Sequence, residues 1–119
     1  MSLELYNYKA EVLRVIDGDT IEVRVSLGFD TYTKKTVRLY GIDTPETRTK
    51  DLEEKERGFA AKEFLIEILN ENNNELLIKS HGIGKFGRCL GELFVETLGT
   101  TSANQTLINE GHAIEYFGK

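Results

Sequence analysis

The first half of the chain alternates apolar and polar positions with period two, as expected for strands that have one buried face. Asp17-Gly18, a dipeptide typical of tight turns, separates the first two stretches and predicts a hairpin. A second connection is expected over residues 26–32, so three strands precede Pro45, the chain's single proline. The predicted strands are residues 6–16, residues 20–25, where the alternation is clearest, and residues 33–40, which are rich in Thr, Val and aromatic residues.

The second half changes to the 3.6-residue period of a helix and then returns to strands. The helical face ends at the asparagines of residues 72–74, and Ser102 with Gln105 matches a capping box that opens a second helix ending near Gly111. Two strands, residues 76–81 and 89–95, flank a glycine-rich loop over residues 82–87. The apolar positions of the first helix are Ala60, Ala61, Phe64, Leu65, Ile68 and Leu69.

The predicted order is three strands, a helix, two strands and a helix. A chain of 119 residues with 39% hydrophobic content suits one domain, residues 1–119, because two domains of half that size would each bury too little surface. We therefore predict an α+β fold that is mainly β: a five-stranded OB-fold Greek-key barrel with two to three helices, a fold whose surface commonly binds oligonucleotides.

The distribution of charged residues along the chain says more about a possible partner than the net charge does. The net charge of -5 argues against a nucleic-acid partner, yet two basic islands contain no acid. The acidic run in residues 51–56 predicts a solvated loop ahead of the first helix. The islands are Lys34, Lys35 and Arg38, and Lys79, Lys85 and Arg88.

The sequence lacks the features of membrane-spanning, secreted and disulfide-bonded proteins. No apolar run reaches the roughly 18 residues of a membrane span, and the N-terminus lacks a basic region followed by an apolar stretch. We therefore expect no membrane partner and no secretory signal, while the compartment stays open. Cys89 is the single cysteine, so no internal disulfide can form, and we interpret it as a strand residue.

Two short acidic motifs, Asp17-Gly18-Asp19-Thr20 and Asp43-Thr44-Pro45-Glu46, lie where strands begin or end. Turn chemistry alone explains an isolated motif of the first kind, and an EF-hand is excluded because position twelve from Asp17 is Gly28. Pro45 restrains the backbone between the second pair of acids. If the barrel brings the acids together, a hard divalent cation would relieve their repulsion. His81 and His112 are interpreted as ordinary polar residues.

Arg38 and Arg88 are the candidate phosphate ligands. The planar guanidinium can bind two equatorial oxygens of a phosphoryl group as negative charge builds on them. Arg38 precedes Asp43 by five residues, and Arg88 ends the glycine-rich loop, where backbone can approach a phosphate closely. A lone arginine in either place would more often be a surface residue.

Taken together, the motifs resemble those of the staphylococcal nuclease, or thermonuclease, family in order and in spacing. The resemblance covers nearly the whole chain and implies a five-stranded OB barrel with calcium-dependent hydrolysis of DNA and RNA, leaving 3′-phosphate and 5′-hydroxyl ends. The motifs are Val15-Ile16-Asp17-Gly18-Asp19-Thr20, then Val37-Arg38-Leu39-Tyr40-Gly41-Ile42-Asp43-Thr44-Pro45-Glu46, and finally Lys85-Phe86-Gly87-Arg88.

The resemblance also implies a role for each matching residue. The carboxylates of Asp19 and Asp43 and the carbonyl of Thr44 would bind the ion, Ca²⁺ with Mg²⁺ or Mn²⁺ as alternatives, and Asp17 would be a supporting acid. Glu46 would orient or deprotonate the attacking water. The resemblance further implies a phosphate-binding role for Arg38 and Arg88, and nucleic-acid contacts for Lys85, Phe86 and Tyr116. We expect a monomer that acts on single- or double-stranded DNA and RNA.

Departures from the family pattern concern the substrate surface. Phe86 stands where a tyrosine is common, so a phenolic hydrogen bond to substrate is missing there, and Tyr116 is equally consistent with packing. The main rival hypothesis is a non-catalytic OB module that binds nucleic acid, as in nuclease-like repeats of Tudor-containing proteins. A protein-interaction domain of a phage or plasmid system is a third class without a positive feature in the sequence.

Overall fold

A closed five-stranded barrel forms the centre of the computed structural model, which describes residues 6–117. The barrel strands follow the order β1-β2-β3-β6-β5, and a separate two-stranded sheet pairs β4 with β7. This arrangement confirms the predicted OB fold. The elements are β1 (Asn7–Asp17), β2 (Thr20–Ser26), β3 (Tyr32–Leu39), β4 (Ile42–Asp43), α1 (Leu52–Glu71), β5 (Glu75–Ile83), β6 (Cys89–Phe94), α2 (Ala103–Asn109) and β7 (Ile114–Glu115), with short 3₁₀ turns at Lys85–Gly87 and Glu96–Leu98.

The barrel closes because β1 pairs antiparallel with both β2 and β5, while β3 pairs parallel with β6. The predicted hairpin is confirmed, with Asp17 opposite Thr20 across its tight turn. In the next pairing, Thr20 lies opposite Arg38. This register brings the first acidic motif and the candidate phosphate ligand to the same end of the barrel.

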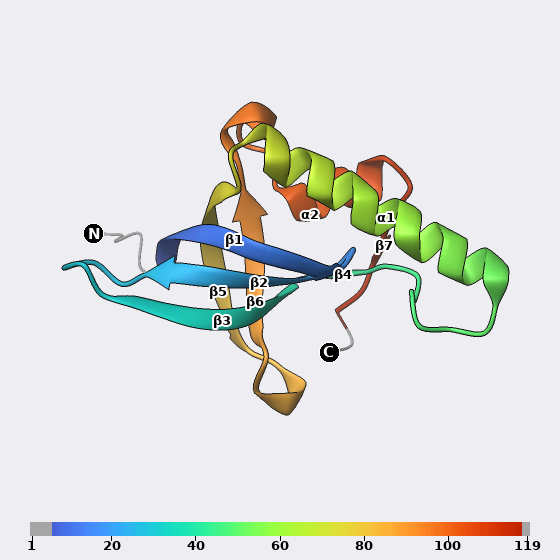
Figure 1. Cartoon of the computed structure of the whole chain (residues 1–119), viewed down its shortest axis with the longest axis horizontal. Helices are drawn as coiled ribbons and strands as arrows, with labels where there is room; N and C mark the ends of the chain where they lie inside the picture. The colour runs from blue at the N-terminus through green and yellow to red at the C-terminus, as the bar shows by residue number, and fades with distance from the viewer. Residues whose placement is uncertain (1–5, 118–119) are drawn as a thin grey trace.

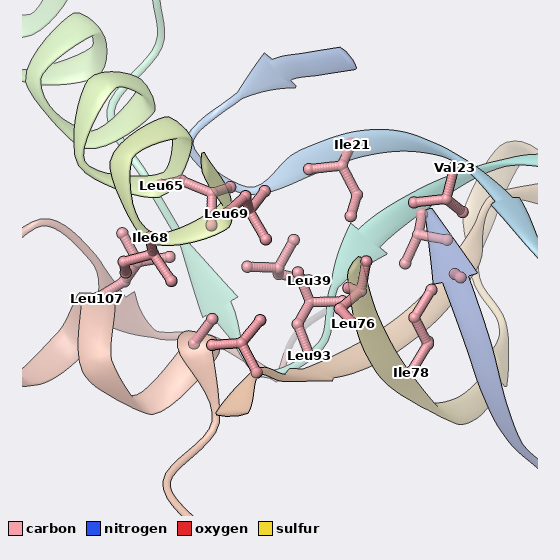
Figure 2. Close-up of a cluster of buried hydrophobic side chains, with 14 of the residues drawn as sticks. Ile21, Val23, Leu39, Leu65, Ile68, Leu69, Leu76, Ile78, Leu93 and Leu107 are labelled. Atoms are coloured by element: carbon pink, nitrogen blue, oxygen red, sulfur yellow. The ribbon is translucent and has the colours of Figure 1, made fainter. Parts of the chain in front are cut away.

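The core fills the barrel and continues beneath the first helix. Figure 1 shows α1 running beside the strands, and α1 packs against both β1 and α2. Figure 2 shows Leu65 and Leu69 of α1 pointing toward Leu39 and Leu93 of the barrel, and all four are fully buried. Burying each such side chain contributes about 1.5 to 3 kcal/mol. No helix within residues 6–117 is long and apolar enough to cross a membrane.

The helix α1 begins earlier than its apolar periodicity indicates. The prediction that the acidic run forms a solvated loop is wrong. Asp51 is the N-cap of the helix, and its side chain accepts the N–H groups of Glu53 and Glu54. Both glutamates lie in the first turn, where their negative charges interact favourably with the positive end of the helix dipole. The helix therefore starts at Leu52, and its first two turns carry few buried side chains.

Two further differences concern short elements. The glycine-rich loop is shorter than predicted, because β5 extends to Ile83 and a 3₁₀ turn covers Lys85–Gly87. Phe86 adopts a left-handed conformation within that turn, with φ of 62°. The small β4–β7 sheet was not predicted at all, since a two-residue strand leaves no periodic pattern to detect.

Candidate active site

Asp19 is fixed by its backbone and its side chain together. Its carbonyl accepts the N–H of Leu39 at 2.8 Å, which joins the β1–β2 turn to the end of β3. One carboxylate oxygen accepts the Thr20 hydroxyl at 3.0 Å, and the other accepts the Thr44 N–H at 3.3 Å. The side chain is only 12% exposed. The first and second acidic motifs are thus linked directly through this carboxylate.

Arg38 lies between the carboxylates of Asp19 and Asp43. Its Nη1 lies 3.6 Å from Asp19 Oδ2, and its Nη2 lies 3.3 Å from Asp43 Oδ1. Nη1 also donates to the carbonyls of Leu39 at 3.3 Å and Ile42 at 3.0 Å. The guanidinium therefore bridges the end of β3 and β4 with both carboxylates around it. The residues predicted as ion ligands and as phosphate ligand form one cluster.

The electrostatics of Asp43 show that its charge is incompletely compensated. Burial raises the pKa of the Asp43 carboxyl above its ordinary value, and the negative charge of Asp19 raises it further. The Arg38 guanidinium opposes both effects without cancelling them. A positive charge placed between the two acids would favour their ionised forms.

The donor set of this cluster suits a hard cation. Within residues 6–117, no three His, Cys, Asp or Glu side chains gather into a metal cage. The candidate ligands are the Asp19 and Asp43 carboxylates with the Thr44 carbonyl, and waters would complete the shell. Ca²⁺ and Mg²⁺ accept such oxygen ligands, and Mg²⁺ commonly retains several waters. The set fits an alkaline-earth ion better than Zn²⁺, which prefers nitrogen and sulfur.

The loop that carries the second acidic motif is held against the first motif and α1. Asp17 accepts the hydroxyl of Thr47 at 2.6 Å and so anchors the loop. A Cβ at Gly58 would lie 2.7 Å from the carbonyl oxygens of Pro45 and Glu46. Only glycine permits this approach of helix to loop. The supporting role of Asp17 near the ion stays a prediction, and its contact in the structure is the hydrogen bond from Thr47.

Arg88 enters the site from the β5–β6 connection. It lines a small pocket with Arg38, Lys85 and Tyr116. Its Nε is buried and has no hydrogen-bond partner among the described residues. A buried N–H without an acceptor costs about 1 to 3 kcal/mol, so this donor is poised for an anion. The structure thus gathers both predicted phosphate ligands around one hollow.

The remaining predicted residues lie at the edge of the cluster. The Tyr116 ring centroid is 5.9 Å from the Arg38 Cζ, and the Phe86 ring centroid is 6.0 Å from the Arg88 Cζ. Phe86 is 92% exposed and does not line the pocket. Glu46 is exposed in the loop, and its backbone N–H donates to Glu54 Oε2 at 3.2 Å. Its side chain forms no hydrogen bond or ion pair with the acids or arginines of the cluster within residues 6–117.

One positioning residue escaped the sequence interpretation. Asn104 is buried in α2 and donates through Nδ2 to the carbonyls of Tyr40 at 2.9 Å and Gly91 at 3.1 Å, while its Oδ1 accepts the Leu93 N–H at 3.0 Å. It ties the helix to β6 and to the turn before β4. The capping box drew attention to its neighbours; nothing local marks this asparagine as a cross-link.

The fold and the site together define an OB-fold domain with a carboxylate pair beside two arginines. A family model described as staphylococcal nuclease homologue matches residues 36–119, and the chain belongs to this family. The family resemblance seen in the sequence is thereby confirmed.

Two relatives extend the comparison. An uncharacterized protein of Bacillus anthracis is 31% identical over 112 residues, which are 92% of this chain and 48% of that protein. The protein named endonuclease YhcR of Bacillus subtilis (strain 168) is 28% identical over 116 residues, which are 92% of this chain and 9% of that protein. The chain therefore spans less than half the length of each of these relatives.

Proposed function

We propose that this domain is a nuclease that hydrolyses phosphodiester bonds of DNA and RNA with the help of a divalent cation. Ca²⁺ is the proposed ion, with Mg²⁺ and Mn²⁺ as alternatives. The observation that carries the proposal is the cluster of Asp19, Asp43 and Arg38 within 3.6 Å, in a chain of the staphylococcal nuclease homologue family. One relative bears the name endonuclease, which agrees with this activity.

The two carboxylates and the Thr44 carbonyl are proposed to hold the cation. When bound, it supplies Lewis-acid polarisation of a phosphoryl oxygen and a template for the reacting groups. Binding is favoured because the negative charge of Asp19 raises the pKa of the Asp43 carboxyl and Arg38 offsets this only in part. Asp17 and Thr47 keep the loop in place through their 2.6 Å hydrogen bond.

Arg38 and Arg88 are proposed to bind the scissile phosphate. The pocket between them has a volume of about 30 Å³. That is room for about two waters, since one water needs roughly 10 to 15 Å³. Phosphate oxygens can therefore enter, whereas a nucleoside cannot. The unpaired Nε–H of Arg88 offers a hydrogen bond that strengthens as charge develops on phosphorus oxygens.

Glu46 is proposed to accept a proton from the attacking water. The water oxygen then bonds to phosphorus, the bond from phosphorus to the 5′ oxygen breaks, and that oxygen takes a proton from solvent. The products are a 3′-phosphate and a 5′-hydroxyl. Glu46 is exposed and lies three residues after Asp43, on the loop that carries the second acidic motif. Lys85, Phe86 and Tyr116 are proposed to contact the nucleotides.

The direct test is digestion of end-labelled single-stranded DNA and RNA by the 119-residue chain. Each divalent ion is titrated into chelator-treated protein, and the product ends are identified by their sensitivity to phosphatase and kinase. We expect calcium-dependent cutting with 3′-phosphate ends. The variants Asp19→Asn and Asp43→Asn should lose the calcium-dependent cutting while circular dichroism shows an intact fold.

One outcome would favour the rival non-catalytic module. Binding of single-stranded DNA without cutting in Ca²⁺, Mg²⁺ or Mn²⁺ would contradict the nuclease proposal. Cutting that persists in excess chelator would instead contradict the assignment of Asp19 and Asp43 as ion ligands.

A further inference from the structure

A second hollow lies beside Asp43 and is separated from the arginine pocket by the β4–β7 sheet. Ile42 and Tyr116 line the arginine pocket, whereas Asp43 and Ile114 line the second cleft. Asp43 and Ile114 are paired in register across this small sheet. Asp43 therefore lines the second cleft, while Arg38, which lies 3.3 Å from the Asp43 carboxylate, lines the arginine pocket.

The second cleft has the size that the arginine pocket lacks. Its volume is about 540 Å³, compared with about 30 Å³ for the pocket between the arginines. Small-molecule sites in proteins span roughly 300 to 1,000 Å³. A polymer whose scissile phosphate rests on Arg38 and Arg88 must place its neighbouring nucleosides outside that small pocket. The second cleft offers such a place next to Asp43.

The helix α1 presents a cation to this cleft. Glu54, Arg57 and Ala60, at intervals of three residues, lie along the wall. Glu54 is engaged with the backbone N–H of Glu46 at 3.2 Å. Arg57 is exposed, and no carboxylate within residues 6–117 forms an ion pair with it. A guanidinium in a cleft with no acid partner is available for an anionic group of a ligand.

The opposite wall supplies surface for a sugar or base. Ile114 is 67% exposed there, although its backbone is held in β7. His112 also lines the cleft, and its ring packs against that of Phe64 with ring centroids 4.6 Å apart. Apolar and ring surface on one side with a free guanidinium on the other matches the two chemical parts of a nucleotide.

We propose that this cleft is a second nucleotide subsite, in which Arg57 contacts the phosphate next to the scissile one and Ile114 and His112 border the attached nucleoside. The proposal rests on the proposed nuclease function, because the scissile phosphate defines the neighbouring position. It adds a substrate requirement: efficient cutting needs a strand that extends beyond the scissile phosphate into this cleft.

The test compares Arg57→Gln with Lys55→Gln, which removes the same charge from an exposed position of the same helix outside the cleft. The substrates are a single-stranded DNA octamer and the dinucleotide TpT, which contains only the scissile phosphate. We expect Arg57→Gln to lower kcat/KM on the octamer about tenfold, the effect of losing one charged hydrogen bond, and to leave TpT unchanged. Lys55→Gln should change neither by more than about twofold.

Single methylphosphonate substitutions in the octamer then identify the contacted phosphate. Neutralising that phosphate should slow wild-type and Lys55→Gln protein about tenfold but have little further effect on Arg57→Gln, since the contact is already gone. Equal losses for both variants, or an equal loss on TpT, would overturn the subsite.

A binding measurement separates failure of the subsite from failure of the nuclease proposal. The same octamers are titrated in chelator and followed by fluorescence anisotropy, so no cutting is required. Coupling between Arg57 and one phosphate in this assay would support the subsite even if the chain cut nothing, an outcome that overturns only the nuclease proposal. Cutting without any such coupling in either assay would overturn only the subsite.

Discussion

The two halves of the candidate site are built in opposite ways. On the carboxylate half, Asp17 accepts a hydrogen bond from Thr47 and Asp19 accepts one from Thr44. Arg38 bridges Asp19 and Asp43. On the arginine half, Arg88 follows a short turn with a left-handed Phe86, and its buried Nε has no acceptor in the described part of the chain.

The difference shows which interactions the fold completes and which it leaves for a ligand. The carboxylate half is preorganised, since its geometry is set by strand register and by packing of α1. Preorganised groups avoid the cost of reorganisation during the reaction. The arginine half keeps an unmet donor, which an incoming phosphate would satisfy. We call the carboxylate half closed, because the fold completes its contacts, and the arginine half open, because it leaves a donor unmet. Substitutions at open or exposed positions should therefore mainly lower turnover, and substitutions in the closed half should mainly change stability.

The largest expected effect is at Glu46, an exposed residue beside the preorganised acids. Glu46→Gln removes the proton acceptor and keeps nearly the same shape, so we expect turnover to fall by roughly 10² to 10⁴ while substrate binding changes little. Steady-state kcat and KM on single-stranded DNA test this expectation. Glu56→Gln, at an exposed position of α1, is the matched control. Equal losses of turnover and binding would refute the assignment of Glu46 to the water.

The next effect is at Arg88, where the open half meets the phosphate. Arg88→Lys retains the charge but loses the planar fork and the Nε–H, so we expect kcat to fall by roughly 10² to 10³. The control is Lys79→Arg, an exposed cation of β5 in the same hairpin. Near-normal turnover of Arg88→Lys would show that Arg88 does not stabilise charge in the transition state.

Sequence information was sufficient for the barrel and for the clustered part of the site. The predicted stretches coincide with all five barrel strands, because turn residues bound each alternating, apolar or β-branched run. The register that brings Thr20 opposite Arg38 follows from adjacent strands joined by short turns. Asp43 lies only five residues after Arg38, so the chain itself keeps it close. Local connections of this kind leave little freedom for other arrangements.

Features that depend on distant contacts could not be predicted in this way. The first two turns of α1 have little apolar periodicity because they are mostly exposed, although Asp51 with the following glutamates is a recognisable capping pattern. Pairing of Ile42 with Glu115 joins segments far apart in the chain. Asn104 is polar yet buried, and its partners lie on other elements. The roles of exposed residues such as Phe86 depend on a substrate that the sequence does not contain.

A third prediction addresses the closed half at Gly58. Helix propensity alone would make Gly58→Ala stabilising by about 1 kcal/mol. The new Cβ, however, would lie 2.7 Å from two backbone carbonyl oxygens of the loop, which cannot move as a side-chain end can. We expect the clash to prevail, with a net loss of about 1 to 3 kcal/mol in the free energy of unfolding, measured in urea.

The control for this prediction is Ala60→Gly, at an exposed position of the same helix. It should cost about 0.5 to 1 kcal/mol from propensity alone. If Gly58→Ala proved stabilising, the helix and the loop would not be in the tight contact that holds the second acidic motif.

The smallest expected effect is the change in the free energy of unfolding caused by replacing Asp43. The sign of this change depends on whether the cation is bound. The folded-state pKa of Asp43 is raised above 3.8, so the folded protein binds more protons than the unfolded chain across the interval from 3.8 to the raised value. Stability therefore decreases as pH rises through that interval. Above it, the ionised carboxylate is a net cost in the absence of a cation.

Asp43→Asn removes this cost and keeps an oxygen that can accept from Arg38. In chelator at pH 7 we expect the variant to be more stable than wild type by less than about 1 kcal/mol, because the side chain is partly exposed. The difference should vanish on acidification below the interval, where wild-type Asp43 is neutral. In saturating Ca²⁺ the order should reverse, since only the wild type gains the free energy of ion binding. Thermal unfolding of both proteins in chelator and in Ca²⁺ measures the reversal. A variant less stable than wild type in chelator would mean that Arg38 fully compensates Asp43, and the closed half would then need no cation to complete it.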